Sequence, residues 1–455
     1  MHIIRKSYLN PYLILVSKFF GVYPFKDFSL EKSVPGYIYT IVLSCLSIFL
    51  LIFICFIIEE PKERYIYSAW TVVVTSYCLS CIACLACRYT CLFNVARYLP
   101  RIQKNFNKVR IALRANFTSR SNWTKKRTEL LHKNLISITF IVLVVLSDVI
   151  RLYYFVTNRN IFDIHVFCYA FRKFQNCTVM CTEFLFCMTA FEARMYCTLL
   201  NEALMDMVEE TRVIQRQAKH GMTNRWTVIE FRDKIESSSQ VSNRILLEDG
   251  KNLSPAISEG YFPDRYCGSS RENAFEYDHA LRNSPENSSL GFYAKIRKLF
   301  TVYVVLERTL KLVNQLFQLQ LAFSCFHIFY LNILVLRHIM GRSASFPLFY
   351  SRTLYVAFCI SFSRFAVIMG NAHLAVSQAQ YTKVLITKIN NRFLDVDTKE
   401  ELDLFWEHIT SSKLEFTACG FFTLNTRLIA SAFVAGTTYL VILLQFNPEK
   451  QNMVS

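Results

Sequence analysis

The stretch YIYTIVLSCLSIFLLIFICFII, residues 37–58, decides the fold class because it contains no charged side chain. It ends at Glu59, Glu60 and Pro61, which close it sharply. A helix rises about 1.5 Å per residue, so about 20 apolar residues cross a hydrocarbon layer about 30 Å thick. The stretch therefore predicts a membrane-spanning helix.

Six more apolar runs follow this first span. They lie at residues 70–86, 135–155, 174–200, 316–336, 348–369 and 421–446. The run at 174–200 is the weakest, because it carries Glu183, Glu192 and Arg194. Together the runs predict an all-α membrane protein with seven transmembrane helices.

The distribution of basic residues predicts the orientation. The N-terminal tail and the loops after spans two, four and six hold 38 Lys and Arg, whereas the other four non-membrane segments hold 8. Lys and Arg concentrate in cytoplasmic loops. The loop at 88–134 carries the most weight, with twelve basic residues against one acid, Glu129. We therefore expect a cytoplasmic N-terminus and an extracellular C-terminus, opposite to a G-protein-coupled receptor.

Composition narrows the function classes. The chain has a net charge of +17, but 53% of its residues are hydrophobic and only 19% are charged. In so apolar a chain, basic loops fit an anionic cytoplasmic leaflet better than a nucleic acid. No GxSxG, HExxH or Walker pattern is present. We therefore expect no enzyme, no catalytic residue, no metal and no cofactor.

The spans divide the chain into seven segments. They are a cytoplasmic or interfacial N-terminal segment (1–36), spans one to four (37–200), a long cytoplasmic loop (201–311), spans five and six (312–370), a cytoplasmic region (371–420), the seventh span (421–446) and an extracellular tail (447–455). The middle of the long loop is rich in Ser, Asn, Gly and Pro. This composition predicts a disordered insert at about 235–290, with helix continuing inward from span four and resuming near Gly291.

Polar residues inside the spans are candidates for function, because a charge at the bilayer centre costs roughly 2.5–3.5 kcal/mol. An outward-open ligand pocket would draw on six of them: Asp148, Arg151, Glu183, His327, Arg352 and Tyr355. Two alternatives stay open. Asp148 and Arg151 lie one turn apart and could neutralise each other. Any of the others could form an inter-helix hydrogen bond that only holds the bundle together.

Cysteines and a glycosylation sequon add local expectations. Cysteines at 78, 81, 84 and 87 share one helix face, which favours close helix packing over metal ligation. Cys168 and Cys177 could bridge a short extracellular loop. Asn176 begins the one sequon that the predicted topology places at the outer side.

The seventh span carries a distinctive pattern. Cys419-Gly420-Phe421-Phe422 and Leu424-Asn425 lead into TTYLVILLQF at 437–446. The order Thr438-Tyr439, five apolar residues, Gln445-Phe446 resembles the signature of the insect gustatory receptor family. The N-terminal LVSKFFGVYPF, residues 15–25, also looks like the opening of that family.

The resemblance implies a tastant-gated, non-selective cation channel in the plasma membrane of sensory neurons. The tastant would be a sugar, a polyol or a bitter compound. The channel would be a homotetramer around a central pore, alone or with other gustatory receptors. The resemblance also implies a cytoplasmic anchor at about 381–414 and a ligand pocket between spans two and six.

The resemblance places the gate at Gln445 and Phe446. Thr438 and Ile442 precede Gln445 by seven and three residues, so they share its helix face and are expected to line the pore. The simpler alternative, a lipid-facing apolar run, does not explain why the span ends in Gln-Phe.

Two other classes remain as alternatives. A G-protein-coupled or odorant-like seven-span chemoreceptor would share the span count. The G-protein-coupled class further requires an outside N-terminus, and this chain lacks an NPxxY pattern in its last span. A transporter would need a Gly- or Pro-interrupted helix at the bilayer midplane, and no span has one.

Overall fold

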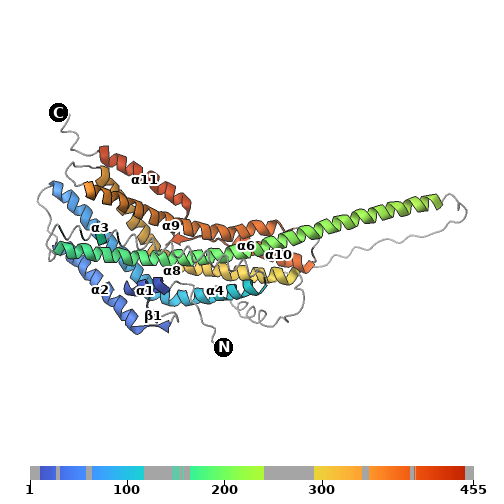
Figure 1. Ribbon diagram of the computed structural model, residues 1–455, viewed down its shortest axis with the longest axis horizontal. Helices are drawn as coiled ribbons and strands as arrows, with labels where there is room; N and C mark the ends of the chain where they lie inside the picture. Colours follow the sequence, from blue (N-terminus) through green and yellow to red (C-terminus); the bar gives the residue numbers. More distant parts are fainter. Residues whose placement is uncertain are drawn as a thin grey trace, which may run out of the picture. The chain divides into compact units, whose positions relative to one another are not determined.

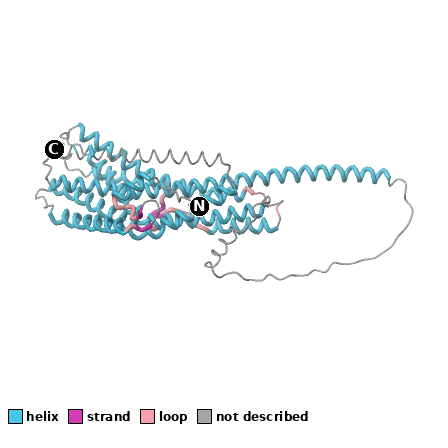
Figure 2. The backbone as a smooth tube through the Cα atoms, turned by 60° about the horizontal axis from the view of Figure 1, so that its bottom comes forward, coloured by secondary structure: helices cyan, strands magenta, loops and turns pink. Residues whose placement is uncertain are grey.

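The computed structural model describes residues 11–26, 31–57, 64–116, 146, 149–150, 153, 157, 164–239, 292–340, 348–389, 394 and 396–445. The described part is almost entirely helical, and its strands form two short antiparallel hairpins (Figures 1 and 2). The chain divides into two units. The first comprises Met1–Ala203, Val302–Val384 and Trp406–Ser455, and the second comprises Leu204–Thr301 and Leu385–Phe405.

The elements have the following bounds. The helices are α1 (Pro11–Phe19), α2 (Val34–Ile57), α3 (Arg64–Tyr89), the π-helical turn η1 (Thr90–Val95), α4 (Ala96–Asn116), α6 (Ile164–Ser239), α8 (Phe292–Met340), α9 (Leu348–Thr387), α10 (Val396–Ser411) and α11 (Thr426–Gln445). Strand β1 (Phe25–Lys26) pairs with β2 (Glu31–Lys32), and β3 (Thr417–Ala418) pairs with β4 (Phe422–Thr423).

Four stretches of the described helices are long and apolar enough to cross a membrane. They are Val34–Phe53, Val74–Arg114, Phe292–Leu336 and Tyr355–Thr387. Apolar helices therefore occur where spans one, two, five and six are predicted. The runs at 174–200 and 421–446 fall in α6 and α11, whereas most of the run at 135–155 lies outside the described residues. The count of seven spans and the side of each terminus stay predictions.

Helix α2 shows how the bundle is built. Its buried face carries Thr40, Leu43, Ser47 and Leu50, while many of its large apolar side chains are exposed. This is the pattern of a helix with lipid outside and small or polar residues inside. The fully buried Arg88 of α3 donates hydrogen bonds to the Leu43 carbonyl oxygen and the Ser47 hydroxyl, which joins α3 to this face.

The cysteine face of α3 packs against α6, as predicted. Cys81 lies 3.2 Å from the Gln175 amide nitrogen, and the Thr182 hydroxyl lies 3.1 Å from the Cys87 sulfur. The predicted bridge between Cys168 and Cys177 is wrong, because both thiols are free and both residues lie on α6. Nine residues of helix separate them by about 13 Å, which is too far for a disulfide.

Helix α6 runs without a break from Ile164 to Ser239, so it continues well past the predicted end of span four. Helix α8 begins at Phe292, close to the predicted restart at Gly291. Residues 240–291, which hold most of the predicted insert, lie outside the described residues. Within the second unit, Lys295 pairs with Glu210 at 2.9 Å, and Phe300 contacts Phe405 at a ring-centroid distance of 4.9 Å.

Candidate functional site

A buried ion pair joins α6 and α9 within the first unit. The guanidinium of Arg364 on α9 donates two hydrogen bonds of 3.0 Å to the two carboxylate oxygens of Glu183 on α6. The two side chains are only 4% and 5% exposed. A bidentate pair of this kind is strong and directional, and it brings α6 and α9 to a fixed separation.

Two neutral groups complete the surroundings of the pair. Ser324 of α8 donates a hydrogen bond to Glu183, and Arg364 donates a third bond to the side-chain oxygen of Asn176 at 3.1 Å. Asn176 and Glu183 are seven residues apart on α6, so they lie on one helix face. The half-buried Asn176 of the predicted sequon therefore contacts the ion pair through its side-chain oxygen, and its modification stays untested.

Beside the pair, α8 presents a polar stripe. Gln320, Ser324 and His327 follow at intervals of four and three residues, and all three are buried. Within the part of the chain that the structure describes, neither ring nitrogen of His327 and neither polar atom of the Gln320 amide has a hydrogen-bond partner. Buried polar groups without partners are costly, which marks His327 and Gln320 as groups able to accept an incoming polar ligand. We name Asn176, Glu183, Gln320, Ser324, His327 and Arg364 the polar cluster.

The structure brings together only part of the predicted ligand pocket. Glu183 and His327 both belong to the polar cluster. Tyr355 is 52% exposed and precedes Arg364 by nine residues on α9, about 13 Å along the helix, so it lies apart from the cluster. Asp148 and Arg151 lie outside the described residues, and so does the side chain of Arg352.

Sequence reasoning missed Arg364, Ser324, Asn176 and Gln320 as cluster members. The signal for Arg364 was present, because a buried carboxylate in one span requires a cation from another. Arg364 is a basic residue inside the apolar sixth run. The three neutral residues carry no such signal, since a lone Ser, Asn or Gln in a span is common.

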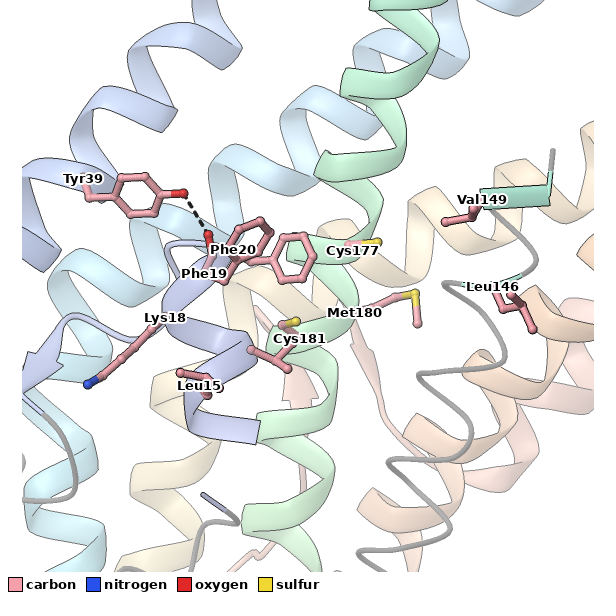
Figure 3. Close-up of a pocket in the computed structure, with 11 residues that line it drawn as sticks. Leu15, Lys18, Phe19, Phe20, Tyr39, Leu146, Val149, Cys177, Met180 and Cys181 are labelled. Atoms are coloured by element: carbon pink, nitrogen blue, oxygen red, sulfur yellow. Dashed lines mark hydrogen bonds between the residues drawn. The ribbon is translucent and has the colours of Figure 1, made fainter. Parts of the chain in front are cut away.

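A cavity of about 910 Å³ lies beside α6, and no member of the polar cluster is among the described residues that line it. It is lined almost wholly by apolar side chains of α1 and α6, with Tyr39 of α2 and with Leu146 and Val149. Figure 3 shows Cys177 and Met180 projecting from α6 toward Leu146 and Val149, with α1 on the other side. Met180 is three residues before Glu183, so the cavity adjoins the helix face that carries the ion pair.

The motif before α11 forms a tight hairpin. The Phe421 N–H donates to the Ala418 carbonyl oxygen at 3.0 Å, and Cys419 and Gly420 both have positive φ, at 51° and 78°. These are the features of a type I′ turn. Burial raises the pKa of the Cys419 thiol, so it stays protonated at neutral pH. The Asn425 side chain accepts a 3.0 Å bond from the Leu428 N–H and so caps the start of α11.

The hairpin is fixed to the bundle on one side by hydrogen bonds and on the other by aromatic contacts. The Asn314 side chain on α8 accepts from the Thr417 N–H at 2.9 Å and donates to its hydroxyl at 3.3 Å. Phe416 is buried edge-on against Phe186 of α6 at a centroid distance of 5.6 Å. Phe186 lies three residues after Glu183, so one face of α6 contacts both the ion pair and the hairpin.

The signature residues of α11 are exposed in the single chain. Thr438, Tyr439, Ile442 and Gln445 all have exposed side chains, and Phe446 lies outside the described residues. Large apolar side chains along this helix are 44% to 62% exposed, namely Phe433, Val434, Tyr439, Val441 and Ile442. The pore-lining and gate roles predicted for this helix stay predictions.

A second ion-pair group lies in the predicted anchor region. Glu307 of α8 is 5% exposed and pairs with Lys311 at 2.5 Å and with His408 of α10 at 2.8 Å. Lys383 lies over the ring of Trp406 at 5.2 Å. These contacts join the end of α10 to α8 and α9.

Comparison with known proteins matches this chain to a family model and to two insect relatives. The family model described as 7tm chemosensory receptor matches residues 11–450. Two Drosophila melanogaster relatives, gustatory receptor for sugar taste 43a and putative gustatory receptor 28b, are 30% and 31% identical over 88 and 85 residues. Each match covers 19% of this chain, and 21% and 18% of the two relatives, so the chain spans about a fifth of their length in these matches.

The solved structures support the fold. The insect olfactory receptor OR5 from Machilis hrabei superposes with a TM-score of 0.64 at 12% identity, covering 96% of this chain and 97% of that one. Its complex with eugenol gives a TM-score of 0.62 at 13% identity over the same shares.

Proposed function

Because the chain belongs to the 7tm chemosensory receptor family, we propose that it is a gustatory receptor that opens a cation-conducting pore when a tastant binds inside its helix bundle. Helix α11 is the observation that carries the proposal. It ends in the signature Gln445 and leaves a long apolar surface uncovered in the single chain. One helix cannot enclose a pore, whereas identical helices around a symmetry axis can. Four chains would each supply α11 as one wall.

The proposed gate lies at the end of α11. Gln445 would present its amide to a hydrated cation, and Phe446 would close the pore by excluding water. With the C-terminus outside, as the charge bias predicts, this gate stands at the outer mouth. The receptor would work in the plasma membrane of sensory neurons.

The polar cluster is the proposed tastant site. Glu183, Arg364, His327 and Gln320 together offer donors and acceptors for several hydroxyl groups, which fits a sugar or polyol. The name of one relative, a receptor for sugar taste, supports the same ligand class. The adjoining apolar cavity supports the alternative, an aromatic and weakly polar bitter compound that would contact Met180.

Binding would reach α11 through α6. A ligand hydroxyl that replaces Arg364 at Glu183 would loosen the α6–α9 link, and Phe186 would pass the shift to Phe416 and the hairpin. Such a change opens the pore only if the ligand binds the open arrangement more tightly than the closed one.

The test is expression of the full chain in oocytes, with current recorded during perfusion of sugars, polyols and bitter compounds. We expect an inward cation current within the panel, unaffected by blocking G proteins. Glu183→Gln should raise the half-maximal concentration of a sugar agonist about tenfold or more, since a charged hydrogen bond contributes roughly 1.5–3 kcal/mol. For an apolar agonist, Met180→Ala is the matched substitution and should raise the half-maximal concentration of that agonist. A silent receptor with confirmed surface expression would refute the channel proposal.

A further inference from the structure

Helix α4 is amphipathic, with a buried apolar face and an exposed basic face. Its buried face carries Leu99, Ile102, Phe106, Val109 and Leu113. Its opposite face carries an exposed basic stripe, namely Arg97, Arg101, Lys104 and Lys108. The helix contains no Asp or Glu. A basic stripe beside membrane-spanning helices is the arrangement that attracts anionic lipid headgroups.

The start of this stripe borders a cavity of about 700 Å³. Three elements line it. Val34, Tyr37 and Ile38 come from the first turns of α2, Leu92 and Phe93 from η1, and Ala96, Arg97 and Arg101 from α4. No acidic residue lines it, and neither arginine forms an ion pair with the residues that the structure describes. The cavity therefore joins two cationic groups to an apolar wall.

The π-helical turn explains why these side chains meet. Within η1, Thr90, Cys91 and Val95 are buried, whereas Leu92 and Phe93 line the cavity. The ring of Phe93 contacts Tyr89 at a centroid distance of 4.8 Å. The guanidinium carbon of Arg97 lies over the ring of Tyr98, 5.6 Å from the ring centroid. Single π-helical turns inside helices occur frequently at functional sites.

The charge and the apolar surface of the cavity lining together indicate which kind of molecule would bind there. Val34 is 69% exposed, Ile38 57% and Phe93 60%. A soluble anion such as inorganic phosphate would satisfy the two arginines but would leave this apolar wall bare. An anionic phospholipid satisfies both, because its phosphate and its acyl chains are joined in one molecule. The wall also continues into α2, whose exposed face suits the lipid bilayer.

We propose that the cavity between α2, η1 and α4 binds an anionic phospholipid from the leaflet on that side. Arg97 and Arg101 hold the headgroup phosphate, and Val34, Ile38 and Phe93 contact the acyl chains. The predicted topology makes this the cytoplasmic leaflet, which is the anionic one. The lipid would fix α2 against η1 and α4, independently of any tastant at the polar cluster.

The test is a lipid titration of the purified full chain in detergent, followed by native mass spectrometry. The probes are dioleoyl phosphatidylserine and dioleoyl phosphatidylcholine. We expect phosphatidylserine to be retained at least tenfold more tightly, and Arg97→Gln/Arg101→Gln to weaken it by about thirtyfold. The matched control is Lys104→Gln/Arg114→Gln, which removes the same charge from exposed positions of the same helix outside the cavity. It should change retention by less than about threefold.

Each other outcome overturns the proposal. Equal losses in the two double variants would mean diffuse attraction to the basic stripe without a built site. If phosphatidylcholine were retained as tightly as phosphatidylserine, the site would not distinguish lipids by headgroup charge. Displacement of phosphatidylserine by millimolar inorganic phosphate would assign the arginines to a free anion. Because the four substituted side chains are exposed, all variants should elute as the parent does on size exclusion, which confirms that they fold.

Discussion

At the scale of single residues, Glu183 and Arg364 form a buried ion pair that links two helices of the bundle. Each would be unfavourable alone, and together they form two 3.0 Å hydrogen bonds with less than a tenth of either side chain exposed. A buried pair contributes little net stability, because desolvation offsets most of the attraction. Its presence therefore fits a role in ligand recognition or in switching between two arrangements.

His327 provides a sharper test at this scale. Its two ring nitrogens are buried without partners among the described residues, a state that costs about 1–3 kcal/mol. His327→Leu should therefore raise the thermal unfolding midpoint while reducing the response to a polar tastant. His373→Leu, at an exposed position of α9, is the control and should alter neither. A lower midpoint for His327→Leu would show that the imidazole is satisfied and structural.

Sequence alone identified the intramembrane Glu183 and His327 but not their neighbours. A charge in an apolar run is visible in the sequence, whereas its partner depends on how three helices pack. Tyr355 lies apart from these two residues, and its role in the pocket stays a prediction. It lies in the predicted sixth span, yet the position of Arg364 further along α9 puts the ion pair about 13 Å from it along the helix axis.

At the scale of elements, the β3–β4 hairpin connects the bundle to α11. Its turn uses two positive-φ residues, and Asn314 and Phe416 fix it to α8 and α6. The sequence showed the Cys-Gly-Phe-Phe pattern without revealing its geometry. No alternation of apolar and polar residues predicts strands of two residues each, so the hairpin could not be anticipated.

Replacing glycine by alanine should change the free energy of unfolding in opposite directions at Gly420, in the turn, and at Gly370, in α9. At Gly420 φ is +78° and an added Cβ would meet nothing within 4 Å, so Gly420→Ala should destabilise through backbone strain alone, by about 1 kcal/mol. Gly370 lies within α9, also in open space, so Gly370→Ala should stabilise by about 0.5–1 kcal/mol. Thermal unfolding of the two purified variants checks the signs. A stabilised Gly420→Ala would contradict the type I′ turn.

At the scale of the whole molecule, the apolar surface of α11 needs a neighbour. Lipid can cover part of it, but the signature Thr438, Ile442 and Gln445 share one face, and polar groups on that face suit water better than lipid. The sequence predicted this helix, its motif and four of the apolar helices that the structure describes. The homotetramer is expected from the family resemblance alone and stays a prediction, because symmetry acts between chains and the packing of a single chain does not reveal it.

The most direct measurement asks whether α11 lines a pore. Gln445→Cys receptors would be expressed in oocytes, and a positively charged methanethiosulfonate reagent would be applied outside during agonist-evoked current. We expect rapid, irreversible block, whereas the parent chain and Phe433→Cys, about a third of a turn around α11, should be unaffected. Equal block at Phe433, or current that persists after modification of Gln445→Cys is verified, would contradict the central claim.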